Sequence, residues 1–159
     1  MKLKLTEFFA LLLSTLVMGV FWGTWFTLTR SLEDFSPAEF IHIGKTIIAN
    51  VAMPMRILMP LTILLLLIAA WLCRKLNSFT FYLYSASFVL MVITLIITVA
   101  VEVPIDNQIK IWTPDTMPAD WQVLRIKWNQ FHTFRTFISI GSVAFFIWGL
   151  INRVKSPQE

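Results

Sequence analysis

Polar side chains recur along one side of the last long apolar stretch of the chain. A helix turns by about 100° per residue, and at that pitch these side chains fall within an arc of roughly 120°. The imidazole of His132 could transfer a proton near neutral pH, and the guanidinium of Arg135 could stabilise a developing negative charge. This face predicts either acid–base chemistry on a bound molecule or a structural polar network. Its members are Trp121, Arg125, Trp128, Asn129, His132, Arg135, Thr136 and Ser139.

A polar face turned toward lipid would be costly, so we expect this one to point into the protein interior. Other polar residues are expected at the same depth, whereas the inner halves of the apolar stretches carry none. The sequence therefore predicts a pocket closed below by hydrocarbon and open, or nearly open, toward the outer side. The other candidates for this pocket are Arg56, Glu102, Asp106, Asn107 and His42, with Glu39 beside them.

Three interpretations of Arg135 are open at this stage. Its side chain could extend to the membrane interface, form a structural ion pair with Glu102 or Asp106, or contact a ligand. His132 could likewise be structural or functional. His42 is the weaker candidate, because an interfacial helix often exposes such a residue.

The two histidines also raise the question of a metal or a haem. Imidazole is the commonest metal ligand, but a stable site usually needs three or four ligands, and no HExxH or HxH spacing is present. We predict no cofactor, with a metal or haem bound through His42 and His132 as the alternative. No nucleophilic triad, phosphate-binding loop or dinucleotide fingerprint occurs in the sequence.

The composition is that of a membrane protein. The 159 residues are 57% hydrophobic and 14% charged, and the mean hydropathy is +0.74, whereas soluble domains are about 45–50% apolar and about 25% charged. Four stretches reach the length of about 20 apolar residues that a transmembrane helix needs. We predict one all-α membrane domain over residues 1–159, a four-helix bundle with short extracytoplasmic amphipathic helices. The predicted spans are residues 8–29, 52–73, 79–103 and 131–151.

The first of these stretches is too long for a signal-peptide core and lacks a small-residue cleavage site, so we expect an uncleaved span.

Basic residues then mark one side of the membrane. Both chain ends and the link between the second and third spans hold six basic and two acidic residues, while the other side holds seven of each. The positive-inside rule predicts a protein of the cytoplasmic (inner) membrane with both termini cytoplasmic. The charges on that side are Lys2, Lys4, Glu7, Arg74, Lys75, Arg153, Lys155 and Glu159.

This charge asymmetry between the two sides explains the basic pI, and no nucleic-acid partner is predicted.

Two small residues, Gly19 and Gly23, are four apart in the first span. That spacing predicts a close helix contact, either within the bundle or in a homo-oligomer.

Two helix starts are predicted in the long outer connections. Ser36 is followed by Pro37 and Glu39, the pattern of a capping box with proline at the first helical position. We expect this helix to lead into the second span. Thr116, two residues before Pro118, suggests a second start.

Prolines predict local bending in two of the spans. Pro54 and Pro60 lie on either side of Arg56, and each lacks the N–H that a helix interior requires. Bent backbone at membrane depth persists where protein or water satisfies it, which again indicates a pocket. Pro104 is expected to end the third span.

The order of these motifs resembles a known family. The sequence FWG stands at residues 21–23, VPIDN at 103–107 and WNQFHTFRT at 128–136. This order resembles the anthrone-oxygenase-like family of small four-helix membrane proteins. The resemblance implies that an anthrone-type polyketide is oxidised to a quinone by O₂ without an evident cofactor. In that chemistry His132 would be the base, and Arg135 and Asn107 would stabilise the enolate.

The sequence departs from the family pattern at Asp106, where an amide is usual, and this adds a negative charge near the expected pocket. Two classes of function follow. The first is a membrane oxidoreductase or oxygenase that acts on a lipophilic aromatic or quinol-like small molecule. The second is a non-catalytic protein that binds membrane lipid or serves as an accessory subunit. A transporter ranks third, because four helices show no inverted repeat.

Overall fold

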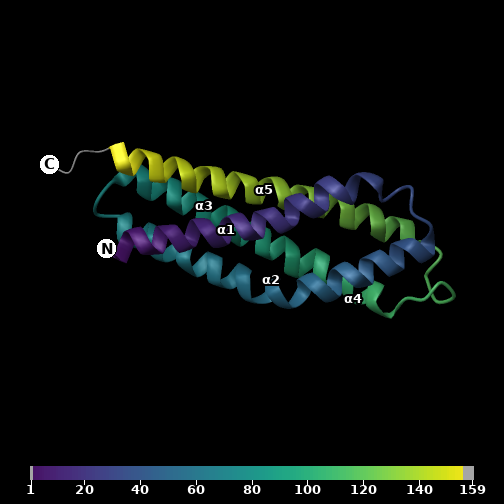
Figure 1. The fold of residues 1–159 in the computed structure, drawn as a ribbon. Coiled ribbons are helices and arrows are strands. Elements are labelled where there is room, and N and C mark those ends of the chain that lie inside the picture. Colours follow the sequence, from purple (N-terminus) through teal and green to yellow (C-terminus); the bar gives the residue numbers. More distant parts are fainter. Residues whose placement is uncertain (1, 156–159) are drawn as a thin grey trace.

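The computed structural model describes residues 2–155, and every regular element in that range is helical (Figure 1). Glu159 and the side chain of Lys155, counted above with the charges of one side, lie outside what is described. The elements are α1 (Lys2–Thr27), η1 (Thr29–Ser31), α2 (Pro37–Cys73), α3 (Ser78–Ile97), the π-helical η2 (Thr98–Glu102), α4 (Val103–Ile111) and α5 (Trp121–Lys155).

Four helical segments in the described range are long and apolar enough to cross a membrane, and together they contain the four predicted spans. They are Lys2–Ser31, Pro37–Cys73, Ser78–Ile111 and Trp121–Arg153. The chain is thus an all-α four-helix membrane bundle, as the sequence predicted.

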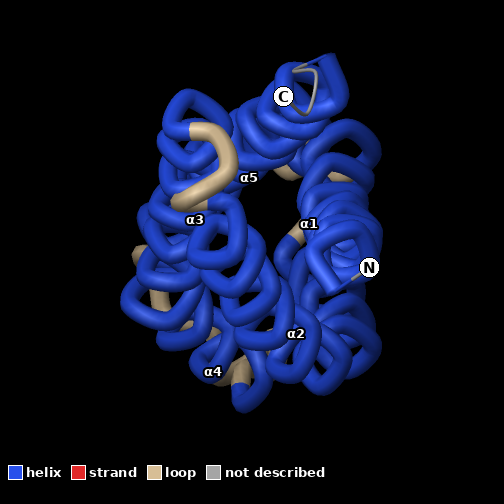
Figure 2. Tube along the Cα trace, turned by 90° about the vertical axis from the view of Figure 1, so that its left-hand side faces the viewer, coloured by secondary structure: helices blue, strands red, loops and turns tan. Residues whose placement is uncertain are grey.

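The four long helices run in alternating directions, so both chain ends lie at one end of the bundle (Figure 1). We call this the terminal end and the opposite one the distal end. Viewed along the bundle, α1 and α3 lie on opposite sides, and each packs against both α2 and α5 (Figure 2). The short helices η1 and α4 and the connection at residues 112–120 all lie at the distal end.

The start of α2 is a capping box, as predicted. The Glu39 N–H donates to Ser36 Oγ at 3.4 Å, and the Ser36 N–H donates to Glu39 Oε2 at 2.8 Å. The helix then continues without interruption to Cys73 through both Pro54 and Pro60. The expected outer helix and the second span are therefore one helix of 37 residues.

Two predicted boundaries are wrong. Thr116 does not begin a helix. Its hydroxyl accepts from the Thr113 N–H at 2.8 Å in a short turn, and α5 begins at Trp121. Pro104 does not end the third span either. The backbone winds into the π-helical η2 just before it, and α4 continues to Ile111. The Val103 N–H donates to the Thr98 carbonyl, so the widened turn precedes the residue that has no N–H to donate.

Two apolar clusters fill the interior. One runs along the bundle and includes the fully buried Val17, Leu66 and Met91. The other closes the distal end, where Phe40 of α2 packs on Trp121 of α5 with ring centroids 5.3 Å apart. The distal connections are therefore anchored to the bundle by burial of large apolar side chains.

The terminal end also contains a buried polar cluster, formed by two charges just beyond the predicted spans 8–29 and 131–151 and by a phenol of the third span. Glu7 is only 3% exposed. It accepts a hydrogen bond of 2.7 Å from the Tyr84 hydroxyl and forms an ion pair with Arg153. Charge complementarity between α1 and α5 thus holds their terminal ends together, with α3 contributing the phenol.

The glycines that matter for packing differ from those expected. A Cβ at Gly19 or Gly23 would meet nothing within 4 Å, so a close contact within the bundle at these positions is ruled out. A Cβ at Gly149 would lie 2.6 Å from Tyr84 Cε1. Glycine at 149 is therefore what allows the Tyr84 ring to lie against α5.

Candidate active site

A cavity of about 510 Å³ lies in the distal half of the bundle. Its apolar wall comes from α1, α2 and α3, and includes Phe21, Met55, Met59 and Leu95. Most of its polar wall comes from the other side, where η2, α4 and α5 meet, and α1 and α2 add Thr24 and Arg56. The polar residues that line it are Thr24, Arg56, Thr98, Asp106, Asn107, Lys110, His132 and Arg135, with Trp128 between them.

Arg135 is held by groups from three elements. Its Nη2 lies 3.0 Å from Glu102 Oε2 in a buried ion pair, and its Nη1 donates to Thr98 Oγ1 at 3.0 Å. Its guanidinium also lies over the Phe21 ring of α1, 4.5 Å from the centroid. Such a cation–π contact gains strength where water is excluded. The π-helical turn supplies both oxygen partners, since Thr98 begins η2 and Glu102 ends it.

His132 is fully buried beside Arg135, and its protonation state follows from this contact. The Nε and Nη2 atoms of Arg135 lie 3.3 and 2.9 Å from His132 Nδ1. Because arginine can only donate, Nδ1 must accept, and the neutral ring carries its proton on Nε2. The backbone carbonyl of Phe21 also approaches the ring. Nε2 itself makes no hydrogen bond to any described residue. His132 therefore carries a buried N–H, and no lone pair, on the side of the ring away from Arg135.

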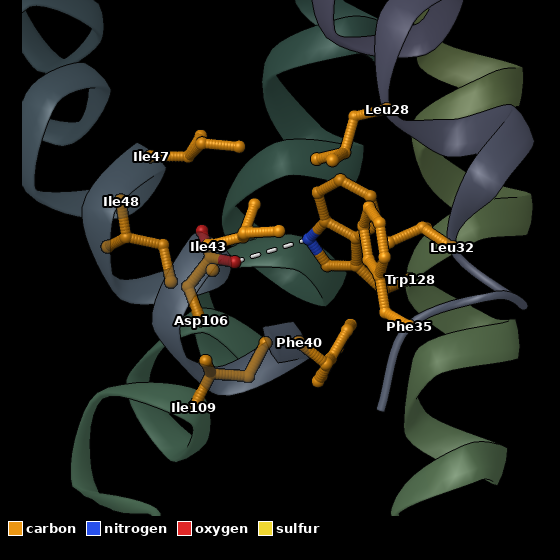
Figure 3. A pocket seen from close by; sticks show the side chains of 11 residues that line it. Leu28, Leu32, Phe35, Phe40, Ile43, Ile47, Ile48, Asp106, Ile109 and Trp128 are labelled. Carbon is orange, nitrogen blue, oxygen red and sulfur yellow. Dashed lines mark hydrogen bonds between the residues drawn. The ribbon is translucent and has the colours of Figure 1, made fainter. Parts of the chain in front are cut away.

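Trp128 fixes the orientation of two neighbours. Its ring stacks on His132 with centroids 4.7 Å apart and an interplanar angle of 3°. Its indole N–H donates to Asp106 Oδ1 at 3.2 Å. A second, smaller cavity of about 30 Å³ lies beside this hydrogen bond. In Figure 3 the α2 side chains Ile43, Ile47 and Ile48 lie on one side of it, and the side chains near η1 lie on the other. Asp106 and Trp128 line both cavities and so separate them.

The predicted site residues divide into those that line the large cavity and those that do not. Arg56, Asp106, Asn107, Trp128, His132 and Arg135 line it. Glu102 is buried behind Arg135. Thr136 is buried, and its hydroxyl donates to the His132 carbonyl at 2.7 Å.

The remaining candidates lie elsewhere. Arg125 donates to the Leu32 carbonyl at 3.0 Å and lies over the Trp121 ring, so it secures the distal connection. Asn129 is half-buried and is not part of the cavity wall. His42 is exposed on α2 and does not line the cavity.

Among the interpretations of Arg135, extension to the membrane interface is wrong, because the residue is only 8% exposed. The ion pair with Glu102 is present, and the same guanidinium borders the cavity. The structural and ligand-facing interpretations are thus compatible.

The placement of the histidines bears on a metal or haem. His132 is buried and lines the cavity, whereas His42 lies exposed outside it. Within residues 2–155, no group of three or more His, Cys, Asp or Glu side chains is arranged to hold a metal ion.

Among the wall residues that sequence reasoning missed, three contact polar groups of the site. Phe21 is part of the FWG motif, but nothing in the pattern shows that its ring would meet a cation of α5. Thr98 lies in a long apolar stretch, and nothing in the sequence shows that the π turn directs its hydroxyl toward Arg135. Lys110 stands one helical turn after Asp106, a spacing that could have identified it.

The match to known proteins covers most of this site. The family model described as anthrone oxygenase matches residues 47–145, more than half of the chain. The chain belongs to the anthrone oxygenase family. The matched range contains Arg56, η2, α4 and the polar face of α5, whereas the Glu7–Arg153 pair lies outside it. No curated protein and no solved structure matches the chain.

Proposed function

We propose that this member of the anthrone oxygenase family is a membrane oxygenase whose substrate is a lipophilic aromatic molecule with an acidic C–H next to a carbonyl. One observation carries the proposal. The side chains of an aspartate, a histidine and an arginine line a single cavity whose opposite wall is mainly apolar. Its volume of about 510 Å³ is within the range of roughly 300–1,000 Å³ typical of small-molecule sites.

The geometry supports a division of roles that differs from the one implied by the resemblance alone. The only lone pair of the neutral His132 ring points at Arg135, so His132 is not placed to act as the base. Asp106 is the carboxylate on the cavity wall, and Trp128 orients it. We assign proton removal to Asp106. His132 Nε2–H, with Arg135 behind it and Asn107 in the same wall, would stabilise the enolate oxygen.

The chemistry is balanced without a further reactant. Asp106 takes a proton from the activated methylene, and the resulting carbanion reduces O₂ and combines with it to form a hydroperoxide. The hydroperoxide takes its proton from the protonated Asp106, which restores the base, and loss of water from it leaves a carbonyl. The net change is that one methylene and one O₂ become one carbonyl and one water. In this proposal no cofactor takes part, so turnover should persist after dialysis against a chelator.

Oxygen uptake by the purified protein with anthrone tests the proposal. Asp106→Asn should lower the rate by about 10²–10⁴-fold, because general-base catalysis contributes that much. His132→Ala should lower it by about 10²–10³-fold, as for loss of an oxyanion-stabilising donor. Asp115→Asn, a change at an exposed residue of the distal connection, is the matched control. An uptake rate no higher than that of anthrone in empty micelles would refute the proposal.

A non-catalytic lipid-binding or accessory-subunit function is the second candidate, and the apolar wall of Met55, Met59 and Leu95 favours it. Lipid that co-purifies in the cavity of a protein without any turnover would support this alternative.

We also propose that the protein resides in the cytoplasmic (inner) membrane, with the terminal end cytoplasmic and the cavity in the outer half. Lys2, Lys4, Arg74 and Lys75 gather at the terminal end, in agreement with the positive-inside rule.

A further inference from the structure

The large cavity reaches the surface of the bundle between two helical edges. On α2 the exposed cavity residues are Ala52, Arg56 and Pro60, one per turn. On the opposite edge, formed by the end of α3, η2 and α4, they are Val99, Val103, Asn107 and Lys110. We call this opening the α2–α4 window.

The α2–α4 window faces lipid. The apolar side chains beside it are exposed on both edges: Met53 is 60% and Ile57 57% exposed on α2, and Val99 is 59% exposed on the other edge. Toward the distal end, α2 and α4 close on each other, because a Cβ on Gly44 would lie 3.1 Å from Ile109 Cγ2. A molecule dissolved in the membrane can therefore reach the cavity from the side.

Two cations border this window, one on each edge. Arg56 makes no ion pair with any residue that the structure describes. Lys110 Nζ donates to Asn107 Oδ1 at 3.1 Å, an uncharged partner. A charge at membrane depth is costly, and the simplest compensation is an anion.

The balance of charge inside the cavity agrees with this. Its charged lining residues are Arg56, Lys110 and Arg135 against the single carboxylate of Asp106. Arg135 is paired with Glu102, whereas Asp106 accepts from the uncharged indole of Trp128 and also interacts electrostatically with Lys110. One positive charge is therefore in excess, and it lies at the mouth of the cavity, where Arg56 has no ion-pair partner among the described residues.

We propose that the α2–α4 window binds the anionic group of a membrane amphiphile, a carboxylate or phosphate, between Arg56 and Lys110. Its apolar part passes through the window into the cavity, against Met55, Met59 and Leu95. Arginine and lysine both bind such oxyanions, arginine with two parallel N–H donors. This binding does not depend on the proposed oxygenase activity, since it requires no turnover.

Quenching of tryptophan fluorescence tests the site, because Trp128 lines the cavity. Dibromostearate should quench the purified protein in neutral detergent at alkaline pH, and the matched dibromostearyl alcohol should bind at least about tenfold more weakly. This difference corresponds to about 1.4 kcal/mol. The exposed Trp22, Trp71 and Trp148 should be quenched by both probes. Trp128→Phe should therefore remove most of the difference in quenching between the acid and the alcohol, which locates the ligand in the cavity.

Variants of the two cations provide the decisive comparison. Arg56→Gln and Lys110→Gln should each weaken dibromostearate binding about fivefold or more and reduce the preference for acid over alcohol. Arg56→Glu should reverse that preference. Lys127→Gln, which removes an exposed cation of α5 outside the cavity, should change neither. All four changes are at exposed residues, and gel filtration confirms that the fold is retained.

Two further probes identify the source of the anion. Stronger quenching by dibrominated phosphatidylglycerol than by dibrominated phosphatidylcholine would indicate a phospholipid headgroup, and a preference limited to dibromostearate would indicate a free fatty acid. Either result supports the site. Equal affinity for acid and alcohol would overturn it, as would unchanged binding in Arg56→Gln and Lys110→Gln. Absence of quenching by any of the brominated amphiphiles would also overturn it.

Discussion

At the scale of single residues, Arg135 determines the chemistry of its neighbours. Its N–H groups donate to Thr98 and, twice, to His132, and its Nη2 also lies 3.0 Å from Glu102 Oε2. Because the guanidinium always donates, it sets the tautomer of His132 and leaves an N–H on the free side of the ring. A residue that could have been a lipid-facing cation is thus the reason that the histidine is a donor and the aspartate is the base in the proposed reaction.

The ion pair gives the first prediction at this scale. Arg135→Gln leaves the Glu102 carboxylate buried without its ionic partner, and its Oε1 already has no hydrogen bond in the described structure. We expect the free energy of unfolding in detergent to fall by about 3–5 kcal/mol, the usual effect of breaking a buried pair. The double variant Arg135→Gln/Glu102→Gln should recover part of this loss.

Reversible denaturant titration in mixed micelles measures both variants. Arg56→Gln is the control, because Arg56 is exposed and has no ion-pair partner among the described residues, and its effect should stay within about 0.5 kcal/mol. If Arg135→Gln were no more destabilising than Arg56→Gln, the Arg135–Glu102 pair would not contribute to the stability of the fold.

At the scale of elements, two irregularities build the site. The π turn of η2 widens the third span next to Pro104 and directs Thr98 and Glu102 toward α5. Such π turns in membrane and soluble helices are frequent at functional sites. The capping box at Ser36 starts α2 early enough for Ile47 and Ile48 of the same helix to line the cavity.

Helix packing gives the prediction at this scale. In Gly149→Ala the new methyl group would lie 2.6 Å from the Tyr84 ring, and this ring is also held by Glu7 and stacked on Phe146. Because the ring cannot move away freely, we expect a destabilisation of about 1–3 kcal/mol.

Gly19→Ala is the matched control, since a Cβ there meets nothing within 4 Å. It should be neutral or stabilise the bundle by up to about 1 kcal/mol through helix propensity. Thermal unfolding of both variants, monitored by circular dichroism, would contradict the packing argument if their midpoints shifted equally. A homo-oligomer through Gly19 and Gly23 stays a prediction that the size of the purified particle can test.

At the scale of the whole molecule, charge and shape are both asymmetric along the bundle. The terminal end carries the excess of basic residues and is closed by the Glu7–Tyr84–Arg153 cluster, and the distal half contains the cavity. A molecule would therefore reach the cavity from the distal half of the bilayer, through its side.

The proposed orientation can be tested by labelling single cysteines in intact cells. In a Cys73→Ala background, Asp115→Cys at the distal end should react with a membrane-impermeant maleimide. Lys75→Cys at the terminal end should react only after the membrane is permeabilised. Both parent residues are exposed, so access depends on the side of the membrane and not on burial. The reverse labelling pattern would place the cavity on the cytoplasmic side.

The sequence by itself determined the helical bundle, its four spans, the capping box at Ser36 and the inward polar face of α5. These features follow from hydrophobic length, local hydrogen bonding and helical spacing, which act over a few neighbouring residues. It also brought Arg56, Asp106, Asn107 and His132 into one expected pocket, because a shared depth in the membrane limits where polar groups can meet.

Only the tertiary structure decided what those groups do. The tautomer of His132 depends on a guanidinium one turn away whose direction is set by Glu102 and Thr98 of another helix. The buried Glu7 of the terminal half depends on partners 77 and 146 residues away. Contacts of this kind leave no local pattern, since they arise when separate helices pack at a particular rotation and height, and a single π turn changes both.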